Sequence, residues 1–267
     1  MLATAGLILS ACVIFSHGTT TQTNITGQPW NIEEPRNTVR DLPLNCLDLQ
    51  QDGMTANGIY TIYPYTDHPN TPVLVLCDQE TDGGGWTVIQ NRYDGSENFY
   101  RSWVEYSEGF GNLEEEHYLG NDLISVLTDQ AVNEMRVDME GLDGVTAYAH
   151  YQAFDVNAEH YYQLSIFNYN GTAGDALIYD HNGQYFSTFD EDHDSYNSGN
   201  CAEEYNGAWW YNECADSDLN GLYEGGFYWD TFAFLKKSKM MIRPYSRVAA
   251  CTGGLHYIQD RAAHLQR

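Results

Sequence analysis

The sequence predicts a mixed fold in which antiparallel strands and a few short helices precede a long irregular segment. In the middle of the chain, apolar and polar residues alternate over three stretches, a pattern typical of antiparallel strands with one solvated face. Two shorter stretches have the pattern of helices. Residues 171–228 are rich in Gly, Asn, Asp and Tyr and have almost no periodicity. Irregular segments this long inside a domain are usually functional or stabilised by a ligand.

The individual elements follow from short apolar or alternating runs bounded by turn residues. Three consecutive glycines, 83–85, interrupt the chain before a strand and indicate unusual backbone angles or close packing, whereas no phosphate-binding pattern follows them. Asn121 or Asp122 is the expected cap of the second helix. The expected strands are 58–63, 73–76, 86–90, 132–139, 145–154, 161–168 and 239–244. The expected helices are 102–110 and 121–127.

The charge balance is strongly acidic. The chain has 267 residues, enough for one large domain or two small ones, with 38 Asp and Glu against 12 Lys and Arg and a net charge of −26. Such a field repels nucleic acids and anionic membrane surfaces and favours cations. The composition therefore argues against a nucleic-acid partner.

The two ends of the chain differ from its middle. Residues 1–18 are expected to be a secretory signal peptide, because their apolar run is too short to span a bilayer. The run Leu9-Ser10-Ala11-Cys12 also matches a bacterial lipoprotein signal. Residues 19–43 are expected to form a flexible stalk and residues 247–267 a tail. No other segment approaches the length of a membrane span, so we expect a secreted, extracellular protein.

Cysteine content and glycosylation motifs fit secretion. Cleavage of the signal would remove Cys12 and leave five cysteines, which in an oxidising compartment should pair with one left over. Two N-x-Thr acceptors, at Asn24 and Asn170, are candidate glycosylation sites. The remaining cysteines are Cys46, Cys77, Cys201, Cys214 and Cys251.

Several short motifs occur in a fixed order between residues 44 and 246. They are CDQETDGGGWTVIQ at 77–90, GFGNL at 109–113, LGND at 119–122, GTAGD at 171–175, FSTFD at 186–190, NCA at 200–202, GAWWY at 207–211, Cys214, LNGLY at 219–223 and MIRP at 241–244. Together they resemble the fibrinogen C-terminal domain family. Within it, the run Gly-Ala-Trp-Trp-Tyr at 207–211 is similar to the lectin-like branch, the ficolins and tachylectins.

The resemblance implies an α+β fold with a central antiparallel sheet, short helices and a loop-rich part that carries calcium and ligand. It also implies the disulfides Cys46–Cys77 and Cys201–Cys214. Each would close a short loop, which stabilises a fold by roughly 3 kcal/mol on chain-entropy reasoning. Cys251 lies beyond the family boundary, where it either links two chains in a disulfide-bonded dimer or stays a free thiol.

The loop at residues 190–200 is the densest acidic stretch of the irregular segment. Like charges this close repel, and either full solvation or a bound cation relieves the repulsion. The spacing does not match an EF-hand, which requires Gly at its sixth and Glu at its twelfth position. The resemblance implies a calcium site with carboxylates from Asp192 and Asp194 and main-chain carbonyls from Tyr196 and Ser198.

The lectin-like branch also implies a pocket for acetyl groups beside the calcium. There, the amides of Cys214 and Ala215 would hold a carbonyl oxygen, aimed by a cis peptide bond between Glu213 and Cys214. Tyr205 would form an aromatic wall, with an ordinary packed loop tyrosine as the alternative. Tyr228 is a candidate for a second pocket aromatic.

These expectations define the predicted function. The main prediction is a secreted, calcium-dependent, lectin-like recognition protein that binds acetylated glycans or similar ligands, with a role in innate immunity. The alternative is an extracellular ligand or matrix protein of the same class that binds a protein and no sugar. An enzyme is not expected, because neither an H-E-x-x-H nor a G-x-S-x-G motif is present.

Overall fold

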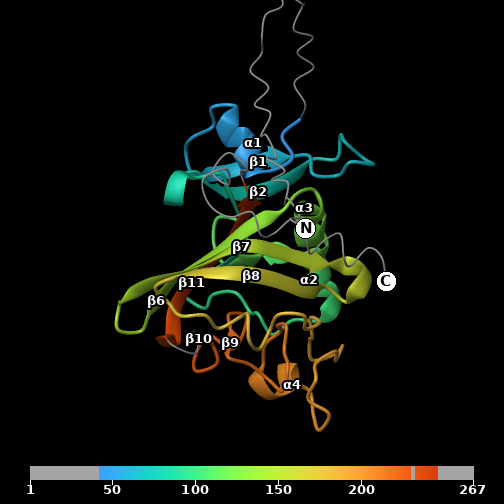
Figure 1. The fold of residues 1–267 in the computed structure, drawn as a ribbon, viewed down its shortest axis with the longest axis vertical. Coiled ribbons are helices and arrows are strands. Elements are labelled where there is room, and N and C mark those ends of the chain that lie inside the picture. The colour runs from blue at the N-terminus through green and yellow to red at the C-terminus, as the bar shows by residue number, and fades with distance from the viewer. Residues whose placement is uncertain (1–41, 230–231, 246–267) are drawn as a thin grey trace, which may run out of the picture. The chain divides into compact units, whose positions relative to one another are not determined.

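The computed structural model describes residues 42–229 and 232–245, which form an antiparallel sheet with short helices (Figure 1). The main path of this sheet runs in the order β1-β2-β3-β11-β6-β7-β8, so the expected α+β class is confirmed. The strands are β1 (Gly58–Ile62), β2 (Val73–Asp78), β3 (Trp86–Arg92), β4 (Phe110–Gly111), β5 (His117–Tyr118), β6 (Asn133–Gly141), β7 (Thr146–Asn157), β8 (Gln163–Gly171), β9 (Ser217–Asp218), β10 (Tyr228–Trp229) and β11 (Ala233–Pro244). The helices are α1 (Cys46–Gln51), α2 (Trp103–Glu108), α3 (Asn121–Asp129) and α4 (Cys201–Tyr205), with 3-10 turns η1 (Thr81–Gly83) and η2 (Ala158–His160).

Several expectations concern residues outside the described part of the chain. These are the signal peptide at 1–18, the stalk at 19–43 except for its last two residues, with Asn24, and the tail at 247–267 with Cys251. Among the described residues, no helix has both the length and the apolar character needed to cross a membrane.

Strand β11 comes last in the sequence but lies in the centre of the sheet, between β3 and β6. Met240 faces Gln90 on one side and Val137 on the other. The strand begins at Ala233, six residues before the predicted start. The added segment contains lysines and has no apolar alternation of its own, so pairing with neighbouring strands keeps it extended. The sheet is therefore completed only when the C-terminal segment docks.

The cap of α3 differs from the prediction. Its N-cap is Gly120, with φ of 102°, and no side chain caps the helix. The two predicted capping residues are used elsewhere: Asn121 accepts a hydrogen bond from the Tyr118 hydroxyl, and Asp122 accepts one from the Tyr162 hydroxyl. Tertiary contacts thus outweigh the local capping preference.

Two of the three glycines at 83–85 allow close packing, as the sequence predicts. A Cβ on Gly84 would lie 2.2 Å from the carbonyl oxygen of Gln79, and one on Gly85 would lie 2.7 Å from the Cδ1 of Leu47 in α1. Both glycines have positive φ, which disfavours any other residue. This close approach positions α1 against the sheet.

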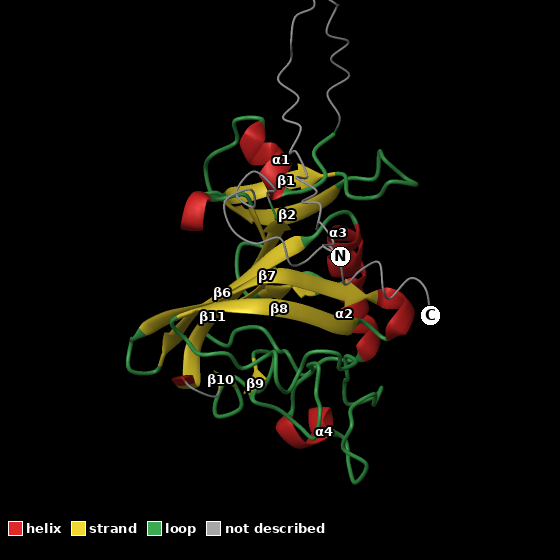
Figure 2. Cartoon of the chain, in the orientation of Figure 1, coloured by secondary structure: helices red, strands yellow, loops and turns green. Residues whose placement is uncertain are grey.

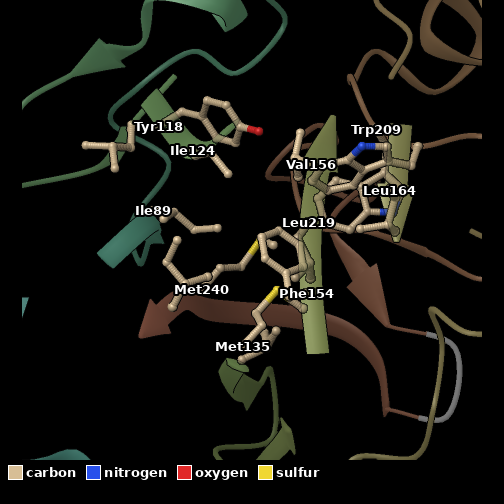
Figure 3. Packing of buried hydrophobic residues seen from close by; sticks show 14 of the residues in the cluster. Ile89, Tyr118, Ile124, Met135, Phe154, Val156, Leu164, Trp209, Leu219 and Met240 are labelled. Carbon is tan, nitrogen blue, oxygen red and sulfur yellow. The ribbon is translucent and has the colours of Figure 1, made fainter. Parts of the chain in front are cut away.

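The main hydrophobic core joins the sheet to the irregular segment. Figure 3 shows Met135, Phe154 and Met240 meeting from β6, β7 and β11, with Leu219 from the loop-rich part beside them and Trp209 farther along the same cluster. All five side chains are buried. Although the segment is mostly loop (Figure 2), apolar packing therefore anchors it to the sheet.

Candidate ligand and calcium loops

Both disulfides that the resemblance implies are present. Cys46 in α1 joins Cys77 in β2 with a Cα–Cα distance of 5.6 Å, and Cys201 in α4 joins Cys214 with 5.4 Å. The second disulfide lies within the irregular segment and spans 13 residues. It ties the acidic loop, which ends where α4 begins, to the candidate ligand loop.

The acidic loop folds around its own carboxylates. The Oδ1 of Asp192 accepts a hydrogen bond from the amide of Asp194 (3.2 Å). The two oxygens of Asp194 accept from the amides of Tyr196 and Cys201, each at 2.8 Å. Burial raises the pKa of Asp194, and the neighbouring Asp192 carboxylate raises it further. The loop therefore holds two interacting carboxylates, of which Asp194 is partly withdrawn from water and Asp192 is exposed.

The carboxylate oxygens of Asp192 and Asp194 are ligands that fit a hard cation. Calcium binds six to eight oxygens, including main-chain carbonyls. No described group of three or more His, Cys, Asp or Glu side chains is arranged for a metal ion. A cation here would thus combine the two carboxylates with main-chain carbonyls. The candidate carbonyls are those of Tyr196 and Ser198, which follow Asp194 in the chain, and Ser198 is exposed. Asp190 is used differently, because its Oδ1 accepts hydrogen bonds from the Trp103 amide and the Thr188 hydroxyl.

The aromatic support of this loop is not evident from the sequence. The ring of His193, between the two aspartates, stacks on Tyr161 at a centroid distance of 4.2 Å. The edge of the same ring meets Trp103 at 5.1 Å. Its amide also donates to the Ser187 hydroxyl (2.9 Å). Residues from two distant segments, together with the nearby Ser187, thereby fix the acidic loop on the domain.

The four predicted ligand residues gather around the second disulfide. The Tyr228 hydroxyl donates to the carbonyl of Ala215 (2.9 Å), and the carbonyl of Cys214 accepts from the Asn212 amide (2.9 Å). Burial raises the pKa of Tyr228, and the nearby Asp218 and Tyr205 raise it further. Tyr205 is the last residue of α4, the helix that begins at Cys201 of the disulfide. Within the described residues, the amides of Cys214 and Ala215 have no hydrogen-bond acceptor.

The predicted cis bond between Glu213 and Cys214 is wrong. The described residues contain no cis peptide bond, and the turn is made instead by Cys214 with φ of 139°. A non-proline cis bond costs about 3 kcal/mol, and here a positive φ at one residue redirects the chain without it. The pair of free amides remains.

His181 is a residue that the sequence did not single out, and it holds the candidate ligand loop in place. It is fully buried, and its Nε2 accepts hydrogen bonds from the amides of Asp216 and Ser217 at 3.2 Å each. Since Nε2 accepts, the proton lies on Nδ1, which donates to the carbonyl of Trp210 (2.7 Å). Burial lowers the pKa of His181, although the nearby carboxylate of Asp180 opposes this. The ring is therefore neutral.

Acidification is expected to loosen this loop. Because the folded pKa of His181 is lowered, the unfolded chain takes up the proton first, and stability falls as pH drops below the ordinary histidine pKa. Between pH 6.5 and 5.5 the loss reaches at most about 1.4 kcal/mol. Urea unfolding of the wild type and His181→Gln at both values measures it, and amide exchange at Asp216 and Ser217 should rise. Equal pH dependence in both proteins would contradict this role.

Fold and site together define a fibrinogen-like globular domain. The model of the family described as fibrinogen beta and gamma chains, C-terminal globular domain, matches residues 42–245, and this chain belongs to that family. Mouse fibrinogen C domain-containing protein 1 is 46% identical over 217 residues, covering 74% of this chain and 46% of that protein. Human fibroleukin is 42% identical over 225 residues, covering 75% and 51%. This chain thus spans about half the length of these relatives.

Solved structures agree with the fold. The fibrinogen-like globe domain of human ANGPTL2 superimposes with a TM-score of 0.71 at 42% identity, covering 76% of this chain and all (100%) of that one. The lamprey fibrin D-dimer, solved with the peptide Gly-His-Arg-Pro-amide, gives a TM-score of 0.70 at 32% identity and covers 81% of this chain and 78% of that one.

Proposed function

We propose that this protein is an extracellular, non-enzymatic recognition domain that binds a positively charged segment of another protein. The observation that carries the proposal is the pair of amides at Cys214 and Ala215, for which the described residues supply no acceptor, with the carboxylates of Asp180 and Asp216 close by. Asp180 accepts from the Asn212 side chain (3.0 Å) and keeps a quarter (25%) of its side chain exposed. Free donors can hold a peptide carbonyl, while the carboxylates attract an amine or guanidinium.

Two further observations support a protein ligand. The net charge of −26 favours association with cationic partners. The lamprey relative was solved with a short peptide that contains arginine. A ligand of the same type would match the charge of the present site.

The test is titration calorimetry with Gly-His-Arg-Pro-amide and with a peptide in which Gln replaces Arg. The Arg peptide should bind at least tenfold more tightly, since hydrogen bonds to charged groups contribute about 1.5–3 kcal/mol. Asp180→Asn should remove most of this preference, whereas Asp67→Asn, a control at an exposed loop position, should retain it. Equal affinity of the two peptides would refute the proposal.

We further propose that calcium binds Asp192 and Asp194, with carbonyls from Tyr196 and Ser198, and thereby sets the loop geometry. Neutralising two close carboxylates is the expected driving force. Asp194→Asn should weaken calcium binding at least tenfold in calorimetry. Glu191→Gln is the matched control, because Glu191 carries the same charge in the same loop and its side chain lies 4.0 Å from His193. A similar calcium affinity for wild type and Asp194→Asn would exclude this site.

A second candidate is the lectin-like function, in which the free amides hold the carbonyl of an acetylated glycan. Tyr205, which is 40% exposed, would then contact the sugar. The test is a glycan array with calcium present. This candidate is favoured if the protein binds N-acetylated sugars and excess Gly-His-Arg-Pro-amide displaces it from them. A role in innate immunity would follow only from this outcome. If the protein binds no such sugar, the lectin-like function is excluded and the proposal of a protein ligand remains.

A further inference from the structure

The lysines of this chain are concentrated on one strand. The sequence contains only three, and all of them, Lys236, Lys237 and Lys239, belong to β11. This strand lies in the centre of the sheet, where lysine is generally depleted. In a chain with a net charge of −26, such a local concentration of positive charge requires a specific explanation.

The strand register places two of these lysines in rows with residues of neighbouring strands. Lys239 faces Asn91 of β3 on one side and Asp138 of β6 on the other, and Asp138 in turn faces Tyr148 of β7. In a second row, Lys237 faces Glu140. Above these rows lies an open cavity of about 500 Å³, within the usual range for small-ligand sites.

Arg136 supplies a third cation to the same cavity. Its Nε donates to the Oδ1 of Asp138 (2.7 Å), and its guanidinium lies 4.1 Å from the centre of the Tyr148 ring. Its Nη1 is 3.8 Å from the carboxylate of Asp82, beyond hydrogen-bond distance. The guanidinium therefore stands in a fixed orientation with donors left over.

The ion pairs in this cavity do not use up its donors. The Nζ of Lys237 lies 2.8 Å from Glu140, and that of Lys239 lies 2.5 Å from Asp78. Each ammonium has three donors, so both keep donors beyond these contacts, although the Lys239–Asp78 pair is the less exposed of the two, with 7% of the Asp78 side chain accessible. Arg92 also lines the cavity, but its guanidinium donates to the carbonyls of Leu219 and Gly221 and is buried.

We propose that this cavity is a second binding site, for a compact organic anion with one carboxylate or sulfate group. Arg136, Lys237 and Lys239 line the cavity together with Asp138 and Glu140, and the donors that their ion pairs leave over would bind the anionic group. The same two carboxylates would repel a polyanion. Ala147 and Tyr148 offer a surface for the uncharged part of the ligand. None of the candidate peptide- or calcium-binding residues lines this cavity.

The experiment is titration of the ¹⁵N-labelled protein with D-glucuronate, D-galactose 6-sulfate and neutral D-glucose, followed by NMR. At least one anionic sugar should shift the amides around Lys237 and Arg136 and bind at least tenfold more tightly than glucose. Lys237→Gln should weaken this binding about tenfold. Lys236→Gln is the matched control, because Lys236 has the same charge and also pairs with Glu140 (3.1 Å) but does not line the cavity.

The outcomes separate a built site from general charge attraction. Unchanged affinity in Lys236→Gln with loss in Lys237→Gln supports the site, and which anionic sugar binds identifies carboxylate or sulfate as the preferred group. Equal loss in both variants, or no preference for an anionic sugar over glucose, overturns it. The proposal is also overturned if a heparin hexasaccharide binds a hundredfold more tightly than either monosaccharide, because that would indicate an extended basic surface.

Discussion

Replacing both Cys201 and Cys214 by serine is expected to lower the free energy of unfolding by about 3 kcal/mol and to abolish tight calcium and peptide binding. The stability loss arises because the disulfide closes a loop of 13 residues and restricts the unfolded chain. The functional loss has a separate cause. The amide of Cys201 donates to the carboxylate of Asp194, while Cys214 carries one of the two free amides. The disulfide therefore connects both candidate sites.

The Cys46–Cys77 disulfide provides the matched control. Replacing these two cysteines by serine should cost a similar amount, about 4 kcal/mol from its 31-residue separation, without affecting calcium or peptide affinity in the folded protein. Urea unfolding and calorimetry at a temperature where both variants remain folded measure the two effects. If the Cys201/Cys214 variant still binds calcium as tightly as the Cys46/Cys77 variant, the disulfide does not organise the acidic loop.

Asp218 is expected to make the protein less stable as pH rises from about 4 to 7. It is fully buried, its Oδ2 accepts from the Tyr211 hydroxyl (2.6 Å), and its Oδ1 accepts from the Asn220 amide (3.0 Å). Burial raises its pKa to about 7, although the hydrogen bonds and the charge of Arg92 act in the opposite direction. Folding therefore favours the protonated carboxyl.

The direction of this change in stability with pH follows from which state binds the proton. Below the unfolded pKa of 3.8 both states are protonated, and the stabilisation by the neutral carboxyl is complete. Between 3.8 and about 7 only the folded state keeps the proton, so this contribution is lost as pH rises. At about 1.4 kcal/mol for each pH unit, the loss is about 4 kcal/mol. Above pH 7 it stays constant.

The isosteric variant Asp218→Asn isolates this effect. Relative to the variant, the wild type should lose about 4 kcal/mol of unfolding free energy between pH 4 and 8, as measured by urea unfolding. Because both proteins share all other titrating groups, these cancel in the difference. A difference that stays within 1 kcal/mol over this range would show that Asp218 titrates alike in both states.

Local pattern predicted much of the fold. The alternation at 132–139, 145–154 and 161–168 identified β6, β7 and β8, because each has one face on the core and one in water. The motifs over 44–246 identified the family and both disulfides. The start of β11 and the cap of α3 were missed, since pairing with two neighbours and contacts to Tyr118 and Tyr162 decide them.

The residues of the candidate site also divide into those that the sequence could predict and those that it could not. Asp192 and Asp194 could be named from the sequence, because the resemblance to the family places the carboxylates of its calcium site at these positions. His181 could not, since a lone histidine has no local pattern, and its role depends on amides 35 and 36 residues later in the chain. The trans geometry of the Glu213–Cys214 bond likewise depends on how the turn packs.

By itself, the sequence determined the acidity of the protein from its composition, and its motifs determined the class of domain and the covalent cross-links through their resemblance to the family. Only the tertiary structure decided which donors stay free at Cys214 and Ala215, and which lysines of β11 share a cavity with Arg136. Those properties arise when strands and loops distant in the chain are held together by a common core, and no local pattern encodes which polar atoms that packing leaves unpaired.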